Sequence, residues 1–189
     1  VDRADKLNLH EHPYWIKLLH YKPRTFGGYR SEVLNRNFFN SDHGHYNSRA
    51  ELVATLEAFF SDLQETDDQQ NPQCRFIARY HWLDSQLQFD PDRLQPRTCN
   101  RFDNWYETID PHQLTLIFPA GTDNNPSSMF GHTLIRIDRQ EQTEQTRLSS
   151  YSINFAAETD ETNGVAFAYK GIMGGYPGRF SIMPYYEKV

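Results

Sequence analysis

The hydrophobic period of the chain changes near Pro111, and this change determines the fold class. Before it, apolar residues recur every three or four positions, most regularly over residues 48–63. After it come short apolar runs of strand length, beginning with 114–118. These periods are typical of helices and strands respectively. The sequence therefore predicts an α+β protein, in which a helical layer of residues 1–112 packs on a small, mainly antiparallel sheet of residues 113–189 within one continuous domain.

Capping and turn residues place the expected elements. Ser48 and Glu51 have the spacing of a capping box, which predicts the start of a helix. Turn residues over 22–47 predict a long loop with a short strand near Phe38. The expected helices span 13–21, 48–63, 76–87, 102–108 and 163–172, and the expected strands span 114–118, 132–138, 148–155 and 179–185.

Composition argues against several classes of protein. Hydrophobic residues make up 38% of the 189 positions, enough for a packed core, so global disorder is not expected. The formal net charge of −6 argues against a nucleic-acid partner, because binding to phosphates needs a dense basic face. The chain contains no apolar run long enough to span a membrane. Aromatic residues make up 14%, which predicts a small core rich in rings.

The two cysteines, Cys74 and Cys99, bear on the cellular compartment. Neither belongs to the paired Cys/His pattern of a structural zinc site. They are therefore either free buried thiols or one disulfide, which would stabilise the fold by roughly 3–4 kcal/mol. Such bridges persist in secreted and periplasmic proteins. The chain starts at Val1 without a signal-peptide pattern, so an exported protein would have lost that peptide already, or the sequence omits it.

The segment 120–133 is the most unusual in the sequence. It joins two expected strands with glycine, asparagine, proline and serine, and long loops of this kind often carry function. It delivers His132 to the start of a strand, next to Gly131, which permits close approach of another group. Such a histidine can act as a general base, or it can simply bond to a loop carbonyl. The residues alone do not separate these two roles.

Several motifs along the chain together resemble one known family. They are Leu114–Pro119, Asn125–Thr133, Asn154–Thr159, Tyr169–Gly171, Gly174–Gly178 and Met183–Tyr186, with Pro13–Trp15, Leu19–Tyr21, Pro72–Phe76 and Ala78–Leu83 upstream. On these motifs, almost the whole chain resembles the Lnb N-terminal periplasmic domain family.

The resemblance implies an exported, periplasmic protein with a permuted papain-like fold, in which the base histidine precedes a nucleophilic cysteine. His132 matches that histidine, whereas Cys74 and Cys99 do not match the cysteine, and this favours a disulfide between them. The family's cysteine lies well downstream. Since this chain stops at Val189 directly after a predicted strand, it is expected to be a C-terminally truncated fragment, inactive alone.

A papain-type histidine needs a side chain that fixes its tautomer. Alternation along the predicted strand puts Ser150, Ser152 and Asn154 on one face, and Asn154 is the preferred partner because its carbonyl can accept the ring N–H. Its alternative role is an amide that caps a turn. The expected substrate cleft is lined by Asn125, Ser127, Ser128 and Tyr176. A serine nucleophile at Ser127 or Ser128 is disfavoured, because no Gly-x-Ser-x-Gly elbow exists.

The function implied by the resemblance is that of a cysteine-dependent acyltransferase or amidase. Some members of the family transfer an acyl chain to the N-terminal cysteine of a lipoprotein. The expected substrate is a lipoprotein, lipid or peptide at the membrane surface, with the full-length protein attached to the membrane. The alternative is a non-catalytic module that binds a lipoprotein, a lipid headgroup or a cell-wall peptide.

No cofactor or metal is expected. The His10/His12 and His43/His45 pairs could each place two imidazoles together, but a metal site needs further ligands, and Asp42 is the only obvious one near the second pair.

Overall fold

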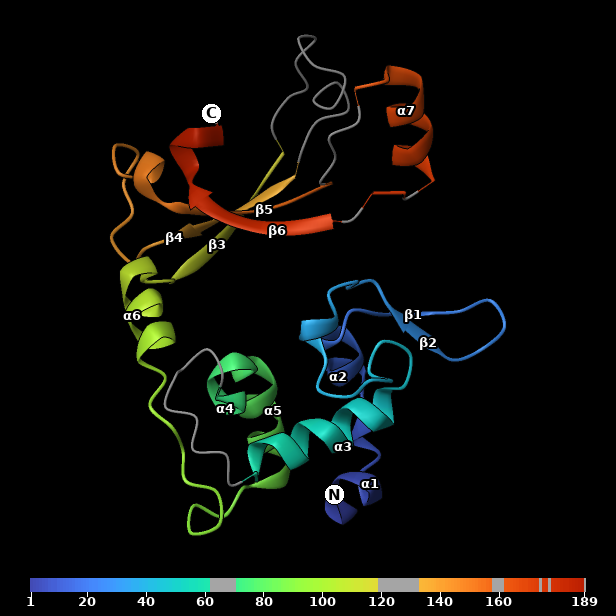
Figure 1. Cartoon of the computed structure of the whole chain (residues 1–189). Coiled ribbons are helices and arrows are strands. Elements are labelled where there is room, and N and C mark those ends of the chain that lie inside the picture. The colour runs from blue at the N-terminus through green and yellow to red at the C-terminus, as the bar shows by residue number, and fades with distance from the viewer. Residues whose placement is uncertain (62–70, 119–132, 158–161, 174, 177, 189) are drawn as a thin grey trace. The chain divides into compact units, whose positions relative to one another are not determined.

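The computed structural model describes residues 1–61, 71–118, 133–157, 162–173, 175–176 and 178–188. Its contacts divide the chain into two compact units, Val1–Phe102 and Asp103–Val189 (Figure 1). The first unit is mainly helical and the second contains an antiparallel sheet. The predicted α+β class is therefore confirmed. None of the helices described is both long and apolar enough to cross a bilayer.

The N-terminal unit contains short helices and one small hairpin. Its elements are α1 (Asp2–Lys6), η1 (Leu9–Glu11), α2 (Pro13–Leu18), β1 (Tyr21–Pro23), β2 (Tyr29–Ser31), η2 (Arg36–Phe38), α3 (Ser48–Phe59), α4 (Pro72–Arg75) and α5 (Ile77–Leu87), and α6 (Asn100–Ile109) crosses the boundary between the units. The strand predicted near Phe38 is wrong, because a 3-10 turn occupies that position. The Asn35 side chain accepts a hydrogen bond from the Asn37 N–H at 2.9 Å and so starts this turn.

The first predicted helix is shorter than expected, and an unpredicted hairpin follows it. α2 ends at Leu18, and the positive φ of His20, 52°, turns the chain into β1. β1 then pairs with β2 in antiparallel register, with Tyr21 opposite Ser31. Pairing with β2 therefore replaces the last turn of the predicted helix.

The predicted capping box of α3 is wrong, although the helix is present. Its N-cap is Asn47, whose side chain accepts the N–H of Ala50 at 2.9 Å. The Ser48 hydroxyl instead donates to the carbonyl of His10. Glu51, the expected second member of the box, turns into the interior of the unit, where it has stronger partners.

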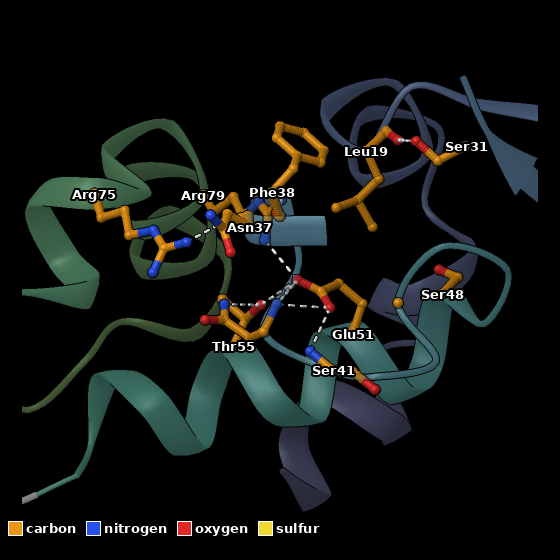
Figure 2. A network of polar contacts seen from close by, with 12 residues as sticks. Leu19, Ser31, Asn37, Phe38, Ser41, Ser48, Glu51, Thr55, Arg75 and Arg79 are labelled. Atoms are coloured by element: carbon orange, nitrogen blue, oxygen red, sulfur yellow. Dashed lines mark hydrogen bonds and ion pairs between the residues drawn. The ribbon is translucent and has the colours of Figure 1, made fainter. Parts of the chain in front are cut away.

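Glu51 is the centre of a buried polar network that surrounds its carboxylate (Figure 2). Its oxygens accept the backbone N–H groups of Asn40 and Ser41, each at 2.9 Å, and the Arg79 guanidinium at 2.6 Å. Arg79, on α5, also donates to the Phe38 carbonyl at 2.6 Å. Burial lowers the pKa of Arg79, and the neighbouring charge of Glu51 opposes this shift. The network fixes the loop that precedes α3 against α3 and α5.

The hydrophobic core of the N-terminal unit is rich in aromatic side chains, as composition predicts. Trp15 of α2 is fully buried, and its ring lies 5.7 Å from that of Trp82 on α5. The other large buried side chains of this core are Leu9, Leu19, Tyr21, Leu52, Leu56, Phe59, Phe76, Tyr80, Leu83, Leu87 and Leu94. The predicted disulfide is present: Cys74 and Cys99 are joined, with their Cα atoms 5.3 Å apart.

The C-terminal unit contains an antiparallel sheet whose spatial order, among the described residues, is β3-β4-β5-β6. Its elements are β3 (Gln113–Ile117), β4 (Leu134–Asp138), η3 (Arg147–Ser149), β5 (Tyr151–Ala157), α7 (Gly164–Ile172), β6 (Gly178–Pro184) and η4 (Tyr185–Lys188). The third predicted strand begins later than expected, at Tyr151, because η3 occupies the preceding residues. α7 begins where predicted, and Asn163 caps it by accepting two backbone N–H groups.

Candidate functional site

The sheet of the C-terminal unit has one polar face. Residues directly paired in an antiparallel sheet point to the same side, and the register pairs Asn154 with Leu134 and Ser152 with Arg136. Asp138 follows Arg136 on the same side of β4. Asn154 is 4% exposed, Ser152 0% and Asp138 5%, so this polar face is buried. Buried polar side chains need partners, and those of this face determine what chemistry it can support.

An ion pair occupies one end of this face. Arg136 Nε lies 2.6 Å from Asp138 Oδ1, and the Thr115 hydroxyl of β3 donates to Asp138 Oδ2. The Arg136 guanidinium also lies 5.3 Å from the ring centroid of Tyr185. Burial opposes ionisation of Asp138, but hydrogen bonds from Arg136 and Thr115 outweigh it and lower its pKa. Asp138 is thus held as a paired carboxylate and is a poor general acid or base at neutral pH.

The three residues proposed to orient a histidine lie next to one another along β5 and just before it. The Ser150 hydroxyl donates to Gln142 Oε1 at 2.5 Å, and the Ser152 hydroxyl donates to the Met183 carbonyl at 3.1 Å. Asn154 lies between Leu134 of β4 and Ser181 of β6. Leu134 is the first residue of β4 and the one nearest to His132 in the sequence. Of the three candidates, Asn154 is therefore the one whose partner on β4 lies closest to His132 along the chain.

Most of the predicted site residues lie outside the described residues. These are His132, Asn125, Ser127 and Ser128. The role of His132 as a base, and that of the other three as cleft residues, therefore stay predictions.

Tyr176, the remaining predicted cleft residue, lies beside α7. Its ring centroid is 5.7 Å from that of Phe167 and 6.0 Å from Lys170 Nζ. Its hydroxyl is buried and has no hydrogen-bond partner among the described residues. In these contacts Tyr176 packs against α7, the helix between β5 and β6.

Three of the four paired histidines use their rings in local hydrogen bonds, whereas His10 Nδ1 is buried without a hydrogen-bond partner among the described residues. His12 Nδ1 caps the first turn of α2, His45 Nε2 accepts from Arg30 Nε at 2.9 Å, and His43 Nδ1 lies 2.7 Å from the Tyr46 hydroxyl. Within the part of the chain that the structure describes, no three His, Cys, Asp or Glu side chains gather in the arrangement of a metal site.

The N-terminal unit contains two adjoining hollows that the sequence did not reveal. The smaller has a volume of about 180 Å³ and is lined by polar residues that include Gln73, Arg93 and Arg97. The larger, about 470 Å³, is lined in part by apolar residues such as Leu56. Phe60 and Arg93 line both. Neither arginine belongs to a motif or a periodic stripe, so no sequence pattern marks these hollows.

Comparison with known proteins assigns the two parts of the chain to different families. Residues 7–86 match a domain of unknown function (DUF7843), and this segment contains the upstream motifs from Pro13 to Leu83. No curated protein and no solved structure matches the chain. Residues 101–189 match the Lnb N-terminal periplasmic domain, and this match begins within two residues of the boundary between the units, Phe102/Asp103. Residues 101–189 are therefore similar to the Lnb N-terminal periplasmic domain family.

Proposed function

We propose that this periplasmic domain supplies the histidine of a thiol active site in an acyltransferase or amidase with a permuted papain-like fold. The observation that carries the proposal is the position of Asn154, 4% exposed and directly opposite Leu134. His132 stands two residues before Leu134 in the sequence, and the even-numbered residues of β4 share the face of Asn154. A carboxamide on that face has the chemistry to accept an imidazole N–H.

The nucleophile in this proposal is a cysteine that follows Val189 in a longer protein. Both cysteines of the chain are joined in the disulfide, so neither is a thiol available for attack. An ordinary thiol has a pKa of about 8.5 and needs a neighbouring base to become a thiolate at neutral pH. His132 would be that base, and Asn154 would fix its tautomer.

The reaction would proceed by double displacement. The thiolate attacks the acyl carbonyl of the donor, and the donor's leaving group takes a proton from the imidazolium of His132. The amine of the acceptor then attacks the thioester, His132 accepts the amine proton, and the thiolate is released. The substrates we propose are a lipoprotein, a lipid or a peptide at the membrane surface, held in a cleft to which Asn125, Ser127, Ser128 and Tyr176 contribute.

The test uses the full-length protein and compares His132→Ala with Asn154→Ala. We expect His132→Ala to abolish formation of the acyl-enzyme, measured by mass spectrometry in a single turnover. Asn154→Ala should slow acylation by about tenfold or more, because the imidazole loses its orientation. Ser150→Ala is the matched control, since Ser150 lies just before β5 and its hydroxyl is bonded to Gln142. Acylation that proceeds normally in folded His132→Ala protein would contradict the proposal.

A second candidate function is binding without catalysis, and the adjoining hollows of the N-terminal unit favour it. Among the described residues, the guanidinium groups of Arg93 and Arg97 have no ion pair or hydrogen bond, and both residues line the smaller hollow. Its polar lining suits an anionic group, such as a lipid headgroup or a peptide carboxylate, and the larger hollow offers apolar side chains beside it. The double variant Arg93→Ala/Arg97→Ala should then lose affinity for such ligands in calorimetric titrations. Binding that survives this substitution would rule out the hollows as the site.

A further inference from the structure

The hairpin β1-β2 carries an exposed loop, residues 24–28, away from the helices of its unit (Figure 1). The Arg24 N–H donates to the Gly28 carbonyl at 3.0 Å, and the Gly27 N–H donates back to the Arg24 carbonyl at 3.1 Å. Gly27 and Gly28 have φ values of 87° and 75°, which other residues adopt only with strain. A Cβ atom built at either glycine would meet nothing within 4 Å. The loop is therefore a defined turn with open space around it.

Phe26 is at the tip of this turn and is 98% exposed, so almost its entire ring faces solvent. A single exposed apolar residue is ordinary on a protein surface. Phe26 differs because the turn holds it clear of neighbouring side chains. Tyr29, at the start of β2, is 39% exposed and adds a second ring, with a polar end, near the tip.

The charge of the hairpin is opposite to that of the whole chain. Residues 21–31 include Lys22, Arg24 and Arg30 and no acidic residue, whereas the chain has a net charge of −6. All three basic residues are exposed. Lys22 lies 3.8 Å from Glu32, in an exposed pair of little strength, and Arg30 donates to His45. The hairpin thus presents one apolar ring at its tip, with Arg24 in the same loop and with Lys22 and Arg30 paired across the strands behind it.

We propose that this hairpin is a membrane-contact element that binds the surface of an anionic phospholipid bilayer. Phe26 inserts between the headgroups, while Lys22, Arg24 and Arg30 lie at the level of the phosphates. Interfacial elements combine apolar residues with basic ones in this way, because apolar burial and attraction to anionic lipid add together. A periplasmic domain has a membrane within reach on either side. This inference does not depend on the proposed chemistry of the C-terminal unit.

A tryptophan at the tip tests the insertion directly. In the complete chain, Phe26→Trp should show a blue-shifted emission on vesicles of phosphatidylglycerol and phosphatidylethanolamine, and quenching when the lipid acyl chains are brominated. The matched control is Phe118→Trp, which places the same reporter at another highly exposed position, 71% exposed. Equal quenching at both positions would indicate non-specific adsorption and would overturn the proposal.

Vesicle sedimentation separates the apolar and ionic contributions. Phe26→Ser should weaken partitioning about tenfold, because the buried ring is lost. Arg24→Glu should weaken it by fivefold or more, because it removes one lipid-facing positive charge, which alone accounts for about fivefold, and adds a negative one; high salt should reduce binding further. Lys6→Glu is the control for net charge, since Lys6 is exposed on α1 outside the hairpin. The proposal fails if vesicles of neutral phosphatidylcholine bind as well as anionic ones, or if no vesicle binds, as expected for a tip that recognises a protein.

Discussion

Glu51 is the residue on which the polar interior of the N-terminal unit depends. Its side chain is 0% exposed, and its carboxylate accepts two backbone N–H groups and the Arg79 guanidinium. A buried carboxylate with a full set of donors is stable where it lies, but removing it leaves those donors without acceptors.

Glu51→Ala should therefore lower the free energy of unfolding by about 3–5 kcal/mol, because Arg79 would remain as an unpaired buried charge. Urea denaturation followed by circular dichroism measures this loss. Glu57→Ala is the matched control on the same helix, where the exposed glutamate should cost less than about 0.5 kcal/mol. Equal losses in the two variants would mean that the network does not stabilise the unit.

The lowered pKa of Asp138 makes the stability of the C-terminal unit depend on pH. Its folded pKa lies below the ordinary value of 3.8, so ionisation favours the folded state. This contribution is complete above pH 3.8 and is lost as the pH falls through the folded pKa. Thermal melts between pH 2 and pH 7 should show that Asp138→Asn reduces stability by about 1–3 kcal/mol at pH 7 and by less at pH 2. A difference that stays constant across this range would contradict the assignment.

At the scale of single elements, the cap of α3 makes a separate prediction. Asn47→Ala should cost about 1 kcal/mol of stability, because the Ala50 N–H loses its acceptor. Asn47→Asp keeps an acceptor and should restore stability in the same urea titration. If Asn47→Ala is silent, the first turn of α3 does not depend on this cap.

The positions of the longer helices could be predicted from periodicity, but their partners could not. The stripe of Leu52, Leu56 and Phe59 marks the buried side of α3, and all three are buried. The cap was misplaced because Glu51 pairs with Arg79, which lies 28 residues away. A short-range motif carries no information about such a distant partner.

The strands could be predicted where apolar residues run together, and the hairpin β1-β2 could not. Each of its strands has three residues and includes exposed ones, so no alternation shows in the sequence. Alternation predicted Ser150, Ser152 and Asn154 on a common side; the register agrees for Ser152 and Asn154, while Ser150 lies just before β5. What the sequence could not supply is the set of hydrogen bonds that occupies Ser150 and Ser152.

At the scale of the whole molecule, the disulfide belongs to the N-terminal unit only. Reduction should therefore destabilise that unit by about 3 kcal/mol, because the unfolded chain gains freedom. Differential scanning calorimetry with and without reductant should show that the melting transition of the N-terminal unit moves to a lower temperature. The transition of the C-terminal unit should stay where it is, since that unit contains no cysteine. Cys74→Ser/Cys99→Ser should reproduce the reduced protein. A uniform shift of every transition would mean that the two units unfold together.

The order of the strands in the C-terminal sheet bears on how this unit is made. In space the strands follow one another as they do along the chain, and each pairs with its predecessor. A polypeptide that emerges amino end first, as it does during synthesis, can thus add every new strand to an edge that has already emerged. No strand has to remain unpaired until a distant later strand is available, and this shortens the time for which a partly folded intermediate is exposed to proteases.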